Sequence, residues 1–144
     1  MRIKLKENLP ICFETTVFVR VTDLNYGGHM GKEMLLVYAQ QARVDFLAHM
    51  GYGELTLAGK GVIMTAAAVV YRSEAHAGEI LTVAMALDDR TAVGFDLYYT
   101  LREKTTDRLI GQVKTGIVCF DYKTKKVSPL PAEVVQKLDQ LPNL

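Results

Sequence analysis

The chain has 144 residues and a mass of 16.0 kDa, the size of one domain, and we expect a single domain over residues 1–144. Apolar residues make up 49% and charged residues 23%, which excludes a disordered, collagen-like or coiled-coil chain as the main state. The net charge of +1 provides no strong field for gathering polyanions, so a dedicated nucleic-acid binder is not expected.

The N-terminal segment and the cysteines bear on location. Charged residues open the chain, but Glu14 and several threonines interrupt the apolar run that follows, so no signal peptide is predicted. No stretch approaches ~18 uninterrupted apolar residues, which excludes a membrane span. Cys12 and Cys119 are too few for a disulfide scaffold and lack metal-ligand spacing, so we expect a reduced, cytoplasmic setting. The histidines also lack ligand spacing, and no metal or cofactor is predicted.

The first element is a strand, and a long helix follows it. Apolar and polar residues alternate over 13–21, which predicts a strand with Val17, Val19 and Val21 on one face. From about Glu33 to Met50 the apolar spacing is helical, and glycines follow as the stop signal. Both flanks of this helix are apolar, so we expect other structure to wrap around it.

The second half of the chain predicts four strands and a short helix. The run 62–71 is apolar on both faces, which is typical of a strand covered on both sides and makes a sticky edge if it is left uncovered. Alternation over 81–87, 93–102 and 112–119 predicts three further strands, with turn signals between them. Residues 131–141 predict a terminal helix with Pro131 in its first turn. Five mostly antiparallel strands and one long helix define an α+β domain.

One loop concentrates polar chemistry, and it lies between the first strand and the long helix. Residues 23–33 hold carboxylates, an amide, an imidazole and several glycines. Free N–H groups at the start of a helix stabilise an oxyanion, and Asp23 or Glu33 could activate a water that Asn25 positions. His29 could exchange a proton near neutral pH. The alternative is structural, since Asp, Asn and Gly are also ordinary turn formers and helix caps.

Several short motifs resemble hotdog-fold acyl-CoA thioesterases, in particular the 4-hydroxybenzoyl-CoA thioesterase-like family. The string VRVTDLNYGGHM over 19–30 is similar to that family's strand ending in Arg and its Asp-x-Asp/Asn-x-x-Gly-His loop. Residues 41–47, 77–81 and 121–131 resemble its helix segment, a strand entry and the last strand with its exit. The likeness covers about 13–141 and implies a hotdog fold, in which a five-stranded antiparallel sheet wraps around one long central helix.

The resemblance also implies an activity and a site. Asp23 and His29 would flank the reacting thioester, Asn25 would position water or the thioester, and Glu33 is a further candidate carboxylate. The backbone of Gly28, His29 and Met30 would donate to the oxyanion. Many members have a catalytic carboxylate where this chain has Asn25, and often Glu where it has Gln41; these departures leave the general base open.

The expected substrate is an acyl or aryl thioester of coenzyme A or of an acyl carrier protein. Arg90, Thr91 and Lys123 lie in predicted turns and are candidates for the phosphates of coenzyme A, although soluble surface turns carry the same residues. The resemblance further implies edge-to-edge pairing of two sheets into a dimer or tetramer, with sites at the interface.

Two other functions remain open at this point. An enoyl-CoA or acyl-carrier-protein hydratase of the same fold also uses Asp and His near a helix start. The loss of carboxylates at Asn25 and Gln41 instead favours a non-catalytic protein that binds acyl thioesters.

Overall fold

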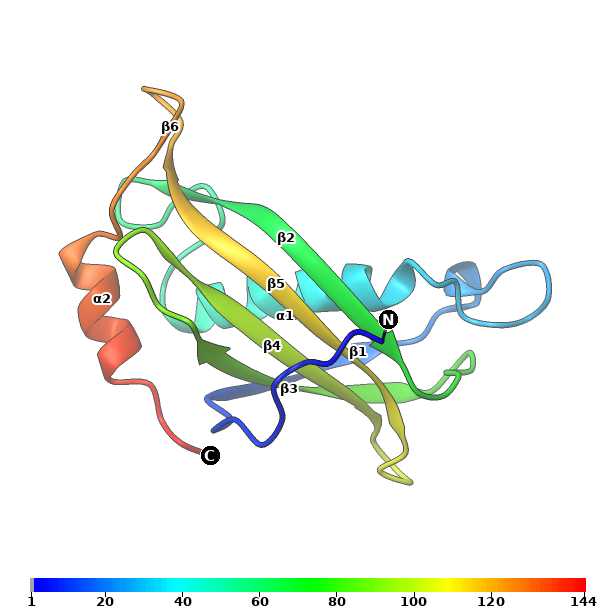
Figure 1. Ribbon diagram of the computed structural model, residues 1–144. Helices are drawn as coiled ribbons and strands as arrows, with labels where there is room; N and C mark the ends of the chain where they lie inside the picture. The colour runs from blue at the N-terminus through cyan, green and yellow to red at the C-terminus, as the bar shows by residue number, and fades with distance from the viewer. Residues whose placement is uncertain (1) are drawn as a thin grey trace.

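A computed structural model describes residues 2–144 and shows one curved antiparallel sheet with two helices (Figure 1). In chain order the elements are β1 (Phe13–Phe18), the 3-10 turn η1 (Val21–Asp23), α1 (Met34–His49), β2 (Gly61–Tyr71), β3 (Ile80–Asp88), β4 (Gly94–Glu103), β5 (Leu109–Asp121), β6 (Lys126–Val127) and α2 (Ala132–Asp139).

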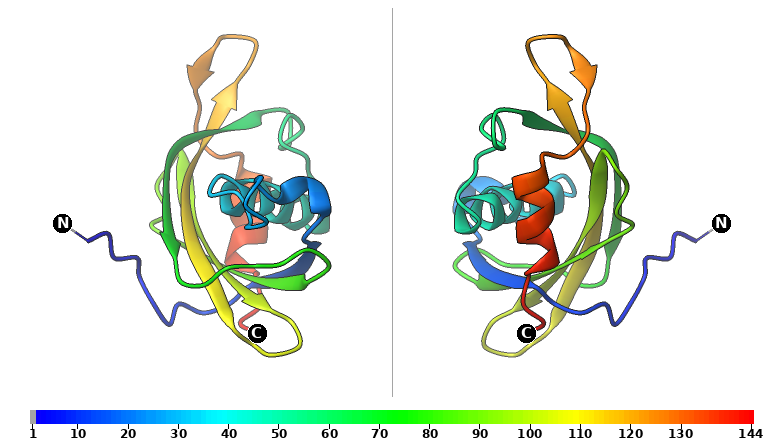
Figure 2. Two further views of the ribbon diagram at one scale, coloured as in Figure 1. Left: turned by 90° about the vertical axis from the view of Figure 1, so that its right-hand side faces the viewer. Right: turned by 90° about the vertical axis from the view of Figure 1, so that its left-hand side faces the viewer.

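The sheet has six strands, not the predicted five. Its order is β1-β3-β4-β5-β2, and β6 pairs with the end of β5. β6 has only two residues, so no alternation in the sequence can reveal it. The sheet curls around α1, as the end-on views in Figure 2 show. The α+β class and the hotdog-type architecture are therefore present.

The core lies between α1 and the concave face of the sheet. Alternate residues of β4 point inward and are buried, namely Phe95, Leu97, Tyr99 and Leu101, as the period-two pattern predicts. The facing side of α1 is closely packed: a Cβ on Gly111 of β5 would lie 2.6 Å from Leu35 Cδ1. A glycine at this position lets the helix approach the sheet.

The first strand is shorter than predicted. β1 ends at Phe18, and Val21 is 77% exposed in η1 rather than on the inward face. The backbone turns here because the Asp23 carboxylate accepts from Arg20 N–H at 3.0 Å, while Asp23 N–H donates to Arg20 O at 2.9 Å. This local pairing replaces the ladder hydrogen bonds that would continue the strand.

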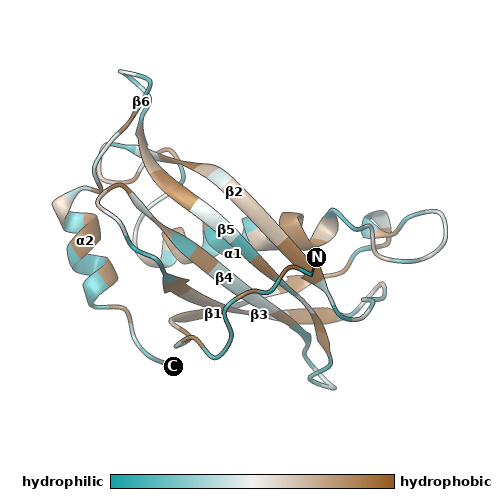
Figure 3. Cartoon of the chain, viewed as in Figure 1, coloured by the Kyte–Doolittle hydropathy of each residue, from teal (hydrophilic) through white to brown (hydrophobic). Residues whose placement is uncertain are grey.

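The prediction that 62–71 is covered on both sides is wrong for the single chain. β2 is an edge strand that pairs only with β5, and Met64 is 50% exposed with its neighbours up to Ala67 also exposed. Figure 3 shows the apolar character of this edge. An uncharged, long apolar edge strand is an unprotected pairing surface.

The terminal helix α2 lies within the predicted range, with Pro131 at its N-cap. It packs Val134 and Leu138 into the core at the end of the sheet that lies away from the α1 N-terminus (Figure 1). Within residues 2–144, no helix is both long enough and apolar enough to cross a membrane.

Candidate active site

The loop before α1 is organised by Asn25. Its side-chain oxygen accepts from the backbone N–H groups of Gly27 at 2.9 Å and His29 at 3.3 Å. The backbone N–H of Asn25 donates to His29 O at 2.7 Å. Gly28 has a φ of +78°, which a residue with a side chain rarely adopts. Because Oδ1 is occupied by backbone donors, the amide nitrogen of Asn25 is the group left to contact a ligand.

Asp23 lies beneath this loop and is 5% exposed. Its carboxylate accepts from Tyr38 Oη at 2.8 Å and pairs with the Arg20 guanidinium at 3.3 Å, in addition to the backbone bond described above. Burial alone would raise the pKa of Asp23, but these hydrogen bonds and the Arg20 charge outweigh it and lower the pKa. The burial of Tyr38 and its bond to Asp23 raise the pKa of the Tyr38 hydroxyl. Asp23 thus ties the loop to α1 as an ionised, fully engaged group.

A second segment of chain, which directly follows β2, faces the loop. His29 Nδ1 lies 2.6 Å from a carboxylate oxygen of Glu74, and Tyr71 Oη donates to Lys32 O at 2.6 Å. Between the two segments is an open cavity of about 590 Å³. Its lining residues are Asn25, His29, Met30, Lys32, Tyr71, Arg72, Ser73 and Glu74.

The predicted site residues fall into two groups. Asn25, His29 and Met30 line the cavity, whereas Asp23 and Glu33 do not. The Glu33 side chain is exposed and folds against Gly31.

The predicted oxyanion donors also differ from one another. The Gly28 N–H donates to Asn25 O at 3.0 Å, and that of His29 to Asn25 Oδ1, as described. The Met30 N–H has no hydrogen-bond acceptor within residues 2–144, so it is free for a ligand oxygen.

The three candidates for binding coenzyme A lie at the other end of the molecule. Arg90 pairs with Asp139 of α2, and Thr91 Oγ1 accepts from Gly94 N–H within the β3–β4 turn at 3.1 Å. Lys123 is in the β5–β6 turn. Figure 1 shows both turns at the end away from the loop that precedes α1, so one chain does not bring these residues to the cavity.

Sequence reasoning missed the cavity-lining residues that directly follow β2. Arg72, Ser73 and Glu74 follow the apolar run directly, which is the only signal they give. Their place opposite His29 depends on how far β2 runs before it ends, and alternation does not define strand ends that closely.

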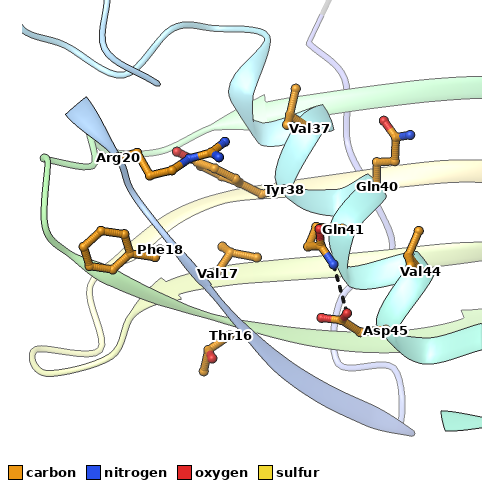
Figure 4. A pocket seen from close by; sticks show the side chains of 10 residues that line it. All are labelled: Thr16, Val17, Phe18, Arg20, Val37, Tyr38, Gln40, Gln41, Val44 and Asp45. Atoms are coloured by element: carbon orange, nitrogen blue, oxygen red, sulfur yellow. Dashed lines mark hydrogen bonds between the residues drawn. The ribbon is translucent and has the colours of Figure 1, made fainter. Parts of the chain in front are cut away.

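A second hollow of about 460 Å³ lies between β1 and α1 (Figure 4). Phe18, Val37 and Val44 form exposed parts of its wall, and Asp45 accepts from Gln41 Nε2 at 3.0 Å and from Thr15 Oγ1 at 2.8 Å. No residue of the loop 23–33 lines this hollow, whereas Asn25, His29 and Met30 line the cavity described above. Within the described residues, no three His, Cys, Asp or Glu side chains are grouped to hold a metal ion.

Comparison with known protein families assigns the chain to a superfamily. Residues 19–138 match the model of the thioesterase-like superfamily, and the chain belongs to that superfamily. A search of curated protein sequences gives no significant match.

Solved structures of related fold agree with this assignment. Slr0204, a 1,4-dihydroxy-2-naphthoyl-CoA thioesterase from Synechocystis, is 19% identical with a TM-score of 0.81, covering 90% of this chain and 96% of its own. YbaW, a probable thioesterase from Escherichia coli, is 22% identical with a TM-score of 0.74, covering 89% and 97%. SAV2348 from Staphylococcus aureus, solved in complex with CoA, is 16% identical with a TM-score of 0.82, covering 97% and 92%.

Proposed function

We propose that this protein is an acyl-CoA thioesterase that hydrolyses its substrate in the cavity between the loop before α1 and the segment after β2. The observation that carries the proposal is that Asn25, His29 and Met30 line one cavity of a chain of the thioesterase-like superfamily, and that the Met30 N–H has no acceptor within residues 2–144. These groups supply a hydrogen-bond donor, a proton acceptor and an oxyanion donor.

In the proposed reaction, Nε2 of neutral His29 takes a proton from water as the water oxygen attacks the thioester carbon. The carbonyl electron pair moves onto oxygen, where the Met30 N–H and the Asn25 amide N–H stabilise it. When the carbonyl reforms, the C–S bond breaks and the thiolate takes the proton from the imidazolium. The products are a free acid and a free thiol, and His29 returns to its neutral form.

Asp23 and Glu33 have other parts in this proposal. The buried Asp23 carboxylate accepts three kinds of donor already, so it supports the loop instead of activating water. Glu33 lies outside the cavity lining and is not needed for the step.

Charge favours coenzyme A as the thiol carrier. Lys32 and Arg72 line the cavity, and neither has a carboxylate partner within residues 2–144. Cations of this kind pair with phosphate oxygens. The structural relative bound to CoA supports the same choice, whereas a carrier protein remains the alternative thiol.

We further propose that two copies pair antiparallel along β2. β2 begins beside the β5–β6 hairpin, where Gly61 pairs with Phe120, and ends at Tyr71 beside the cavity. Antiparallel pairing of two β2 strands sets the start of one next to the end of the other. Lys123 of the partner subunit would then lie near this chain's cavity, where it could contact the phosphates of coenzyme A.

The test is release of free thiol from a panel of acyl-CoAs, from short to long and aromatic, by wild type and by Asn25→Ala. The proposal expects thiol release by wild type and a loss of about 100-fold in the variant, the effect of removing one oxyanion donor. Water addition to an enoyl-CoA without thiol release would instead identify a hydratase. Tight acyl-CoA binding without any product would identify a binding protein, and either result would refute the thioesterase.

A further inference from the structure

The contact between His29 and Glu74 joins two segments that are far apart in the sequence. His29 Nδ1 and Glu74 Oε2 are 2.6 Å apart, a short distance for a nitrogen and a carboxylate oxygen. An ionised carboxylate only accepts, so Nδ1 must carry the hydrogen. The neutral ring then has its lone pair on Nε2. We propose that Glu74 is a positioning residue, which holds His29 in the tautomer that can accept a proton from water.

Glu74 is exposed, but the backbone that carries it is firmly held. Ser73 N–H donates to Ile110 O at 3.1 Å and Ser73 Oγ to Leu109 O at 2.7 Å, so the residue before Glu74 is fixed to β5. Ala75, the residue after it, is fully buried. Because both neighbours are anchored, the backbone of Glu74 has little freedom to move.

Arg108 braces the same segment from the β4–β5 turn. Its guanidinium donates to Glu74 O at 3.0 Å and pairs with the Glu79 carboxylate at 3.0 Å. On the opposite side, the Tyr71–Lys32 bond ties the loop of His29 to the end of β2. The segments that carry His29 and Glu74 are therefore held by contacts that do not depend on the hydrogen bond between these two side chains.

The exposure of His29 and Glu74 distinguishes a positioning role for Glu74 from a role in stabilising the fold. The side chains of His29 and Glu74 are 56% and 57% exposed, and a polar contact so accessible to water contributes little to stability. Removing the Glu74 side chain should therefore change which ring nitrogen of His29 carries the hydrogen, and it should leave the unfolding temperature almost unchanged. The charged groups around the imidazole in the cavity are Lys32, Arg72 and Glu74.

The first test is the tautomer of His29, read from ring ¹⁵N shifts at a pH where the ring is neutral. The signals of the three histidines are assigned with a His29→Gln variant. We expect the Nδ1–H form in wild type, the common Nε2–H form in Glu74→Ala, and retention of Nδ1–H in Glu74→Gln, whose amide oxygen still accepts. An Nε2–H wild type, or a tautomer unchanged in Glu74→Ala, would overturn the inference.

The second test is kinetic, and it rests on the proposed thioesterase function. Glu74→Ala should lower kcat about 10- to 100-fold, as for outer carboxylates that orient a histidine, with KM within about twofold of wild type. Glu74→Gln should recover part of that loss, and Glu14→Gln, on an exposed residue of β1, should equal wild type.

The two tests fail separately. A wild-type kcat in Glu74→Ala would refute the positioning role while leaving the thioesterase intact. An inactive wild type with the expected tautomers would refute the proposed function while leaving the orientation of His29 by Glu74 established.

Discussion

At the scale of residues, the loop before α1 shows which side-chain roles a sequence can carry. The sequence predicted that Asn25 and His29 would lie at one site, because both fall in the same short loop before a helix. It did not separate the buried Asp23 from the cavity residues, since burial depends on Tyr38 and Arg20 closing over the carboxylate. Glu74 was missed because a contact across 45 positions has no local signal.

Tyr38→Phe should destabilise the protein in a pH-dependent way. The Tyr38 hydroxyl donates to a buried carboxylate, and a hydrogen bond to a charged group contributes about 2 kcal/mol. Since the pKa of Asp23 is lowered on folding, this stability is complete above the unfolded value of about 3.9 and is lost as pH falls through the folded pKa.

Urea unfolding at pH 7 and pH 3 measures the effect of that change. The gap between wild type and Tyr38→Phe should be widest at pH 7 and shrink at pH 3. Tyr26→Phe is the matched control, because Tyr26 is fully exposed and should show no gap. An equal gap at both pH values would mean that the hydrogen bond from Tyr38 does not lower the pKa of Asp23.

Asn25→Asp distinguishes an amide donor from a carboxylate base at the same position. The aspartate oxygen can still accept from Gly27 and His29, so the loop should keep its shape. It has no N–H for the thioester oxygen, and kcat should fall about 100-fold. Asn143→Asp, an exposed control near the C-terminus, should not change kcat. A faster Asn25→Asp would show that the site works with a carboxylate base.

At the scale of elements, alternation located the long strands but not their ends or their neighbours. The inward positions of β3, β4 and β5 are those that the period of two predicts. β1 ended early because a side-chain hydrogen bond turned the backbone, and β6 was too short to have a period. The sequence could not predict what covers β2, because an apolar run does not show whether the residues packed on it belong to the same chain or to a second copy.

Gly111→Ala should destabilise the contact between α1 and the sheet. The added Cβ would meet Leu35 Cδ1 at 2.6 Å and Val70 O at 2.7 Å, so the Leu35 side chain and the backbone of β2 must both shift. Overpacking of this kind costs about 1–3 kcal/mol. Chemical denaturation compares it with Gly59→Ala, where a Cβ would meet no atom within 4 Å although the φ of +89° adds strain. A Gly111→Ala variant as stable as wild type would mean that the helix is not held this closely.

At the scale of the whole molecule, the two sheet edges differ in protection. β1 carries Glu14 on its short edge, whereas β2 has no charged residue from Gly61 to Tyr71. Charged and short edges resist pairing, and long uncharged ones favour it. The fold itself could be predicted from the sequence, since motif order and spacing extend over about residues 13–141. The assembly could not, because it depends on which edge stays open.

Ala67→Asp should convert the proposed dimer to a monomer. The substitution puts a carboxylate on the exposed middle of β2, where antiparallel pairing brings two copies of the same region together. Sedimentation should give twice 16.0 kDa for wild type and 16.0 kDa for the variant. Thr16→Asp on the other edge should remain a dimer, and a wild-type monomer at micromolar concentration would contradict the pairing.

The most direct measurement of the central claim is thiol release from the best acyl-CoA of the panel by wild type, His29→Gln and His49→Gln, each shown to be folded. His49 lies at the opposite end of α1 and is exposed, so it is the matched histidine. We expect His49→Gln to equal wild type and His29→Gln to be slower by about 100-fold or more, the contribution of a proton-transfer group. A His29→Gln variant that turns over at the wild-type rate would contradict the account.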